Sequence, residues 1–231
     1  LILVLLGISF SSLFGMRGEA IINIGERFVN TPTSYDTLTY GRLYKDGNLP
    51  AFMLTTDKFY AQYNLETSAP EDYTLDISLL REGGSVVEKK VIKVNSPLTI
   101  GSTRIYLQAN GYSPVVTVRD SKGNVAFQGP VPFLPQDSNL RSIGAIKVPD
   151  ADPQIGFVGS FIPTADRSAS RGAFSSFPEA LDPRLLLSVF QGDLGMDDGI
   201  PQSVYRLDTS KMERIGLKEL AIGESYSFNG V

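Results

Sequence analysis

The residue types that most often carry chemistry are unevenly represented in this chain. It contains no His and no Cys. Their absence excludes from this chain a Ser-His-Asp triad, a thiolate metal site, a Cys nucleophile and His ligation of haem. Carboxylate pairs, Ser-Lys dyads and Tyr remain available for acid–base or nucleophilic chemistry.

Two acidic segments are the candidates for metal or carboxylate chemistry. Residues 192–199, Gly-Asp-Leu-Gly-Met-Asp-Asp-Gly, have the composition of a calcium loop, but Leu194 stands where that loop requires an oxygen ligand. Asp150 and Asp152 are followed or preceded by prolines, which is typical of a turn. We expect solvated turns at both places. A carboxylate-based hydrolase stays an alternative, because sequence alone cannot place two acids across a cleft.

Composition sets the class of protein. The chain has 231 residues, with 21 Lys plus Arg against 25 Asp plus Glu, so its net charge is −4. That balance argues against a nucleic-acid groove, which needs a basic face to neutralise phosphates. The length allows one large or two small domains. We expect an extracytoplasmic domain over 16–231, with two subdomains dividing near 137–145.

Residues 1–15 form an apolar run that is interrupted only by serines. As a helix this run would be about 22 Å long, less than the roughly 30 Å of a bilayer's hydrocarbon core. It lacks the positive start of a signal peptide and the charged face of an interfacial helix. We expect it to be the C-terminal end of a transmembrane helix that begins outside this chain. A buried core segment is the alternative.

The rest of the chain predicts a mainly β protein with antiparallel, sandwich-like sheets. Residues 73–79 alternate strictly between apolar and polar, and Gly83-Gly84 follows before the alternating run 86–94, which together predict a hairpin. Further expected strands are 103–107, 114–119, 125–127, 144–148, 155–162, 185–190, 204–207 and 219–228. A short helical turn is expected near 55–60, and an exposed loop over 164–182.

Residues 130–135 contain three prolines, and proline removes a backbone donor, so this segment cannot be a central strand. We expect an extended crossing segment, with Val131, Phe133 and Leu134 packed in the core. The competing hypothesis is an exposed docking strip with Phe133 free to contact a partner.

Several motifs together resemble those of the ResB-like cytochrome c biogenesis proteins, in the actinobacterial version. They lie at 30–31, 41–43, 94–101, 105–118, 129–137, 181–184, 192–195 and 199–205. The resemblance covers nearly the whole chain. It implies a cell-membrane protein of System II with a few transmembrane helices and one large extracytoplasmic domain. It also implies a ResC-type (CcsA-type) membrane partner, with haem delivered across the membrane for attachment to apocytochrome c.

We transfer no haem site to this chain, because the family's haem ligands are attributed to histidines and this chain has none. Haem would be handled by the full-length protein and its membrane partner. The family-motif positions that we single out are expected to be structural: Asn95, Pro97, Leu98, Tyr106, Gly111, Pro130, Pro132, Phe133 and Pro135. We therefore expect a scaffold that binds and positions, not an enzyme, with no cofactor or metal on this chain. A generic cell-surface binding module is the remaining alternative.

Overall fold

The structure is a computed structural model that describes residues 1–231 except 45–48, 121, 171, 197–198, 200–201 and 228–231. The chain is mainly β and falls into two compact units. Unit 1 comprises 1–62 and 70–108, and unit 2 comprises 63–69 and 109–231. The boundary expected near 137–145 therefore moves to 108–109. Residues 137–145 lie within unit 2, because β12 (Ser142–Val148) begins there and pairs with its neighbours on both sides.

Unit 1 begins with helix α1 (Ile2–Phe14), whose side chains are all exposed or nearly so. Strand β1 (Met16–Glu19) follows directly and pairs antiparallel with β3 (Thr37–Tyr40). A short 3-10 turn, Pro32–Ser34, precedes β3. Within the described residues, no helix combines the length and apolarity needed to cross a membrane.

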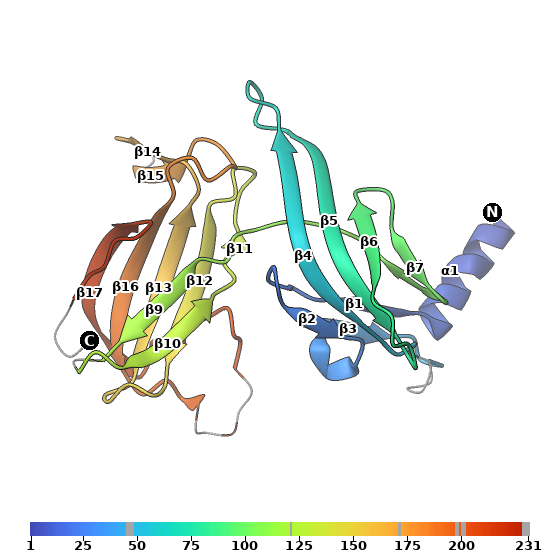
Figure 1. Cartoon of the computed structure of the whole chain (residues 1–231), viewed down its shortest axis with the longest axis horizontal. Coiled ribbons are helices and arrows are strands. Elements are labelled where there is room, and N and C mark those ends of the chain that lie inside the picture. Colours follow the sequence, from blue (N-terminus) through green and yellow to red (C-terminus); the bar gives the residue numbers. More distant parts are fainter. Residues whose placement is uncertain (45–48, 121, 171, 197–198, 200–201, 228–231) are drawn as a thin grey trace. The chain divides into compact units, whose positions relative to one another are not determined.

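The main sheet of unit 1 has the order β2-β4-β5-β6, formed by β2 (Arg27–Val29), β4 (Phe52–Tyr63), β5 (Pro70–Arg81) and β6 (Glu88–Lys93) (Figure 1). Alternate residues of β5, Ile77 and Leu79, are fully buried, as the period-two pattern predicts. They pack with Phe52, Leu54 and Ile92 and with the ribbon of β7 (Leu98–Ile100) and β8 (Thr103–Ile105). The predicted hairpin at 73–94 is confirmed as the β5–β6 pair.

Unit 2 is built on a five-stranded antiparallel sheet of order β11-β12-β13-β16-β17. Its other strands are β11 (Leu134–Pro135), β13 (Ile155–Ile162), β16 (Arg184–Gly192) and β17 (Met212–Ala221). Figure 1 shows the hairpin of β9 (Val115–Arg119) and β10 (Val125–Pro130) lying over one face of this sheet. The core lies between these layers and joins Val118 and Phe133 to Ile146, Phe157 and Val189.

Four local predictions are wrong. Residues 55–60 belong to β4 and are not helical, because burial of Leu54 and Thr56 on one face outweighs their local propensity. The expected loop 164–182 contains a hairpin of β14 (Ala165–Ser168) and β15 (Gly172–Ser175). Residues 204–207 form a turn and coil, and the last strand covers 212–221, not 219–228.

Candidate functional site

The family-motif positions of unit 1 form a turn and the start of a ribbon. Asn95 adopts a left-handed φ of 63°, and the backbones of Lys93 and Ser96 exchange hydrogen bonds around it. Pro97 follows, and Leu98 begins β7 opposite Ile105. Tyr106, just after β8, is exposed. The segment from Asn95 to Leu98 thus reverses the chain between β6 and β7, a local structural role.

The motif positions of unit 2 surround Phe133, which is 2% exposed. Its backbone amide donates to the Tyr112 carbonyl at 3.0 Å. A Cβ added to Gly144 or Gly159 would lie 2.7 or 2.8 Å from the Phe133 ring, so both strands need glycine beneath it. The prediction that Phe133 is buried is confirmed, and the exposed-strip hypothesis is wrong for this side chain.

The prolines on either side of Phe133 position the chain rather than a ligand. Pro130 ends β10, where it pairs with Val115, and Val131 is buried in the core. Pro132 lies between Val131 and Phe133, and Pro135 ends the two-residue edge strand β11. Gly111 faces the Pro135 ring, since a Cβ there would lie 3.4 Å from Pro135 Cγ. Proline lacks the backbone N–H that would donate to a neighbouring strand, and this loss costs least at the edge of a sheet.

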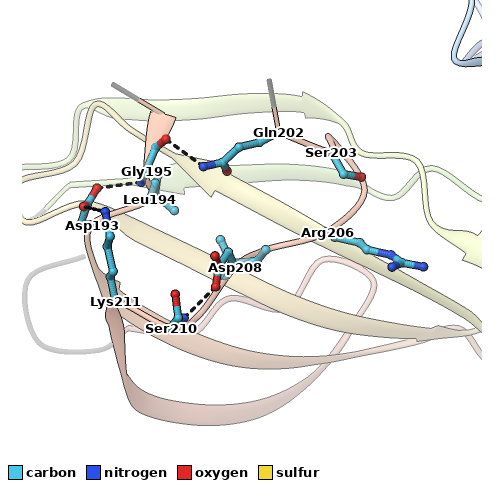
Figure 2. Close-up of a pocket in the computed structure, with 10 residues that line it drawn as sticks. Asp193, Leu194, Gly195, Gln202, Ser203, Arg206, Asp208, Ser210 and Lys211 are labelled. Atoms are coloured by element: carbon cyan, nitrogen blue, oxygen red, sulfur yellow. Dashed lines mark hydrogen bonds and ion pairs between the residues drawn. The ribbon is translucent and has the colours of Figure 1, made fainter. Parts of the chain in front are cut away.

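A pocket of about 480 Å³ lies in unit 2, formed by the loop between β16 and β17. Its floor is apolar: Leu194 and Leu207 pack on β13 at Gly156, where an added Cβ would lie 2.6 Å from a Leu207 methyl. Figure 2 shows its polar side chains arranged around this floor. The described lining residues are Asp193, Leu194, Gly195, Gln202, Ser203, Arg206, Leu207, Asp208, Ser210 and Lys211.

Strands β12 and β13 anchor the pocket loop through polar side chains. Gln154, just before β13, accepts the Leu194 amide on its side-chain oxygen at 2.9 Å and the Gly192 amide on its backbone carbonyl at 3.0 Å. Gln202 donates to the Gly195 carbonyl at 2.8 Å. Lys147 of β12 donates to the Gln202 side chain at 3.1 Å and to the Ser203 carbonyl at 3.0 Å. These bonds hold both described arms of the loop on the sheet.

Hydrogen bonds lower the pKa of both carboxyl groups that line the pocket. Asp193 accepts the Gly195 amide at 2.7 Å and faces the Lys211 ammonium at 3.3 Å, and these contacts lower its pKa. The Ser210 amide and hydroxyl lower the pKa of Asp208. Partial burial lowers the pKa of Lys147. Both carboxyls are therefore ionised at neutral pH, so neither is suited to donate a proton as a general acid.

The arrangement suits binding by hydrogen bonds and salt bridges. Asp193 pairs with Lys211, and Asp208 and Arg206 also line the pocket beside its apolar floor. Among the residues that the structure describes, no three acidic side chains come together in a way that could hold a metal ion. The sequence predicts that 192–199 is a solvated turn and not a calcium loop. Part of this segment lies outside the residues that the structure describes. A mixed surface of this kind matches a stretch of polypeptide better than a small anion.

A second polar cluster brings together a serine and a lysine, the two residue types of the Ser-Lys dyad that the sequence left open. Ser78 Oγ lies 2.6 Å from Lys89 Nζ and 2.7 Å from Asp57 Oδ2 on adjacent strands of unit 1. Hydrogen bonds from Ser78 and then Lys89 lower the pKa of Asp57. Lys89 also donates to Asp57 and is 75% exposed. Ser78 donates its hydroxyl proton to Asp57 and accepts from Lys89, so the hydrogen bond from serine to lysine that a Ser-Lys dyad needs is not made.

Comparisons with known proteins bear on the whole chain. The model of the ResB-like family matches residues 1–228. A curated relative, Cytochrome c biogenesis protein CcsB from Synechococcus sp. (strain JA-3-3Ab), is 27% identical over 146 residues, which is 63% of this chain. That match spans only 28% of the relative's own length. No solved structure is similar.

Proposed function

We propose, because this chain belongs to the ResB-like family, that it serves cytochrome c biogenesis as a binding scaffold. The family match over residues 1–228 is the observation that carries the proposal. The similarity to a protein named for cytochrome c biogenesis supports the same process. The matched stretch is 28% of that relative, so the relative's process is carried to this chain as part of this proposal only.

In this proposal the full-length protein lies in the cell membrane, with α1 in the bilayer and the β units on the extracytoplasmic side. Its partners are a membrane protein of the ResC or CcsA type and apocytochrome c. Haem is the cargo of that assembly, and it is attached to the apocytochrome with no bond made or broken by this chain. The β units hold the unfolded apocytochrome near the site of attachment.

The chemistry of the described residues supports binding over catalysis. Among the described residues, six carboxyl groups have a clearly shifted pKa, and in all six it is lowered by hydrogen bonds: Asp57, Asp72, Glu88, Asp120, Asp193 and Asp208. A carboxylate-based hydrolase needs one acid with a raised pKa. No observation on the described residues favours that alternative.

The residues of this chain do not fit haem ligation. The chain has neither His nor Cys, so Met and Tyr are the side chains that could reach the iron axially. Met16, Met53 and Met212 are partly covered within strands β1, β4 and β17, and Met196 lies in the pocket loop. We therefore assign haem ligation to the rest of the full-length protein and its partner.

The test is assembly of cytochromes c in cells whose own gene for this protein is deleted. The full-length protein is supplied as wild type, as Arg206→Glu in the pocket, or as Arg104→Glu on β8 as a control with the same change of charge. We expect haem staining of cytochromes c with wild type and with Arg104→Glu, and a clear loss with Arg206→Glu at equal protein level. Full staining in cells that lack the protein altogether would refute the proposed function.

A further inference from the structure

Helix α1 ends in a fixed junction with the turn that follows β3. The Leu43 amide donates to the Leu13 carbonyl at 2.8 Å, and the Gly41 amide donates to the Gly15 carbonyl at 2.7 Å. A Cβ on Gly41 would lie 2.4 Å from the Leu13 carbonyl oxygen. The last carbonyls of a helix need such partners. Residues 40–44, the Tyr40–Tyr44 turn, are therefore held at the level where α1 ends.

The surface of α1 is mainly apolar up to this junction, with the hydroxyls of Ser9, Ser11 and Ser12 as its polar groups. Residues 2–14 contain no charged side chain, and none of them is buried by the protein. A helix that is apolar all round is buried in a protein core or in lipid. Because none of the described residues of unit 1 buries α1, lipid is the occupant that its surface fits. The first charges, Arg17 and Glu19, follow the helix and pair with each other in β1.

The Tyr40–Tyr44 turn has the composition of a membrane interface. Tyr40 and Tyr44 stack at 5.2 Å between ring centroids, and Leu43 between them in sequence is 52% exposed. Arg42 is also exposed. Tyrosine rings and long cationic side chains gather where headgroups meet the hydrocarbon core. Phe10 and Phe14 lie 4.7 Å apart on the last turns of α1, with their ring planes tilted by 33°.

We propose that the Tyr40–Tyr44 turn rests in the headgroup region of the bilayer beside the end of α1. This inference rests on the membrane attachment in the proposed function and goes beyond it. The turn adds a second, interfacial contact. Leu43 enters the acyl boundary, the tyrosine rings lie among the headgroups, and Arg42 meets lipid phosphate. The junction hydrogen bonds tie this interfacial contact to the end of α1.

The chain contains no Trp, so a single introduced Trp is a clean reporter of depth. The 231-residue chain is reconstituted in vesicles of phosphatidylcholine and phosphatidylglycerol, with bromine atoms placed on the lipid either near the headgroup or near the acyl end. Three variants are compared: Tyr44→Trp in the turn, Leu5→Trp in α1, and Tyr60→Trp as an exposed control on β4 of the same unit. Fluorescence quenching is measured for each variant.

We expect Tyr44→Trp to lose most of its emission to bromines near the headgroup and less to those near the acyl end. Leu5→Trp should be quenched by bromines in the hydrocarbon core, and Tyr60→Trp by neither lipid. An unquenched Tyr44→Trp beside a quenched Leu5→Trp would overturn this inference and leave membrane attachment intact. An unquenched Leu5→Trp would overturn both. Equal quenching of Tyr60→Trp and Tyr44→Trp would show that the turn has no special contact.

Discussion

Phe133 shows how a family-motif residue stabilises the fold without touching a ligand. Its ring fills the space left by Gly144 and Gly159 on neighbouring strands, so the three residues form one packing unit. The sequence predicted the burial of Phe133 from the prolines around it. It could not predict the glycines beneath the ring, because their proximity to Phe133 depends on the register of β12 and β13.

Phe133→Ala should lower the free energy of unfolding by about 3–5 kcal/mol, the usual range for a buried aromatic side chain. That is a large share of a typical stability of roughly 5–15 kcal/mol. Urea denaturation measures it. Val115→Ala, at an exposed position of β9, is the control and should change stability by no more than about 0.5 kcal/mol. An unchanged midpoint with Phe133→Ala would contradict the packing account.

Ionisation of Tyr112 should lower the stability of the folded protein at alkaline pH. Burial raises its pKa from 10.0 to about 12, with smaller contributions from Tyr63 and Glu179. Its hydroxyl donates to the Pro178 carbonyl at 2.8 Å, a bond that the ionised form cannot make. Because the folded pKa is above the unfolded value, the stabilisation is complete below pH 10 and is lost as pH rises to about 12.

The measurement is the melting temperature of wild type and Tyr112→Phe across this pH range. The wild type should lose more stability than the variant between pH 10 and 12, while Tyr106→Phe, which alters an exposed residue, should follow the wild type. Parallel curves for wild type and Tyr112→Phe would show that this hydroxyl does not titrate as proposed.

At the scale of elements, period-two alternation was a reliable guide where one face of a strand is buried. The β5–β6 hairpin was predicted on that basis. Strand β4 was missed: in its second half one face is exposed, at Lys58 and Tyr60, and the other is only half-buried. Its pairing with β2 and β5 decides its conformation, and that information is not local to its sequence.

The pocket could be predicted only in part. The acidic segment at 192–199 has the composition of a calcium loop, but Leu194 stands where that loop needs an oxygen ligand. The sequence indicated no other role for Leu194. In the structure Leu194 is buried against Gly156, together with Leu207 from the far arm of the loop. Two leucines within a polar loop were the available signal that this loop folds back onto the sheet.

The pocket loop should depend on Gln154, which accepts two of its amides. Gln154→Ala removes the side-chain acceptor of the Leu194 amide, so this amide should exchange with deuterium faster. Hydrogen exchange with peptide-level mass spectrometry measures the change. Gln136→Ala is the control, because the Gln136 side chain donates to carbonyls of its own segment, those of Leu134 and Pro135. Equal exchange in wild type and Gln154→Ala would mean that packing of Leu194 alone holds the loop.

At the scale of the whole molecule, the sequence indicated two β subdomains but placed their boundary too late. Residues 137–145 look like a linker because they are polar between two apolar runs. The boundary at 108–109 has no such composition, since both flanks carry motif residues. Long-range pairing decides which strands share a sheet. Composition alone therefore misplaced the boundary between the two units.

The chain should not bind haem in a defined complex, since its side chains offer neither His nor Cys to the iron. Absorbance titration of the purified chain with haem tests this expectation. Weak, non-saturating changes are expected. A stoichiometric complex with a defined Soret band that is lost on replacing one Met or Tyr would show that this chain takes part in haem ligation.

The central claim, that this chain is a binding scaffold in cytochrome c biogenesis, is tested most directly by co-purification. The tagged full-length protein is isolated from membranes that contain apocytochrome c, as wild type, as Arg206→Glu and without residues 20–231. The account predicts that apocytochrome c is recovered with the wild type, recovered less with Arg206→Glu and lost when 20–231 is removed. Equal recovery of apocytochrome c from all three preparations would contradict it.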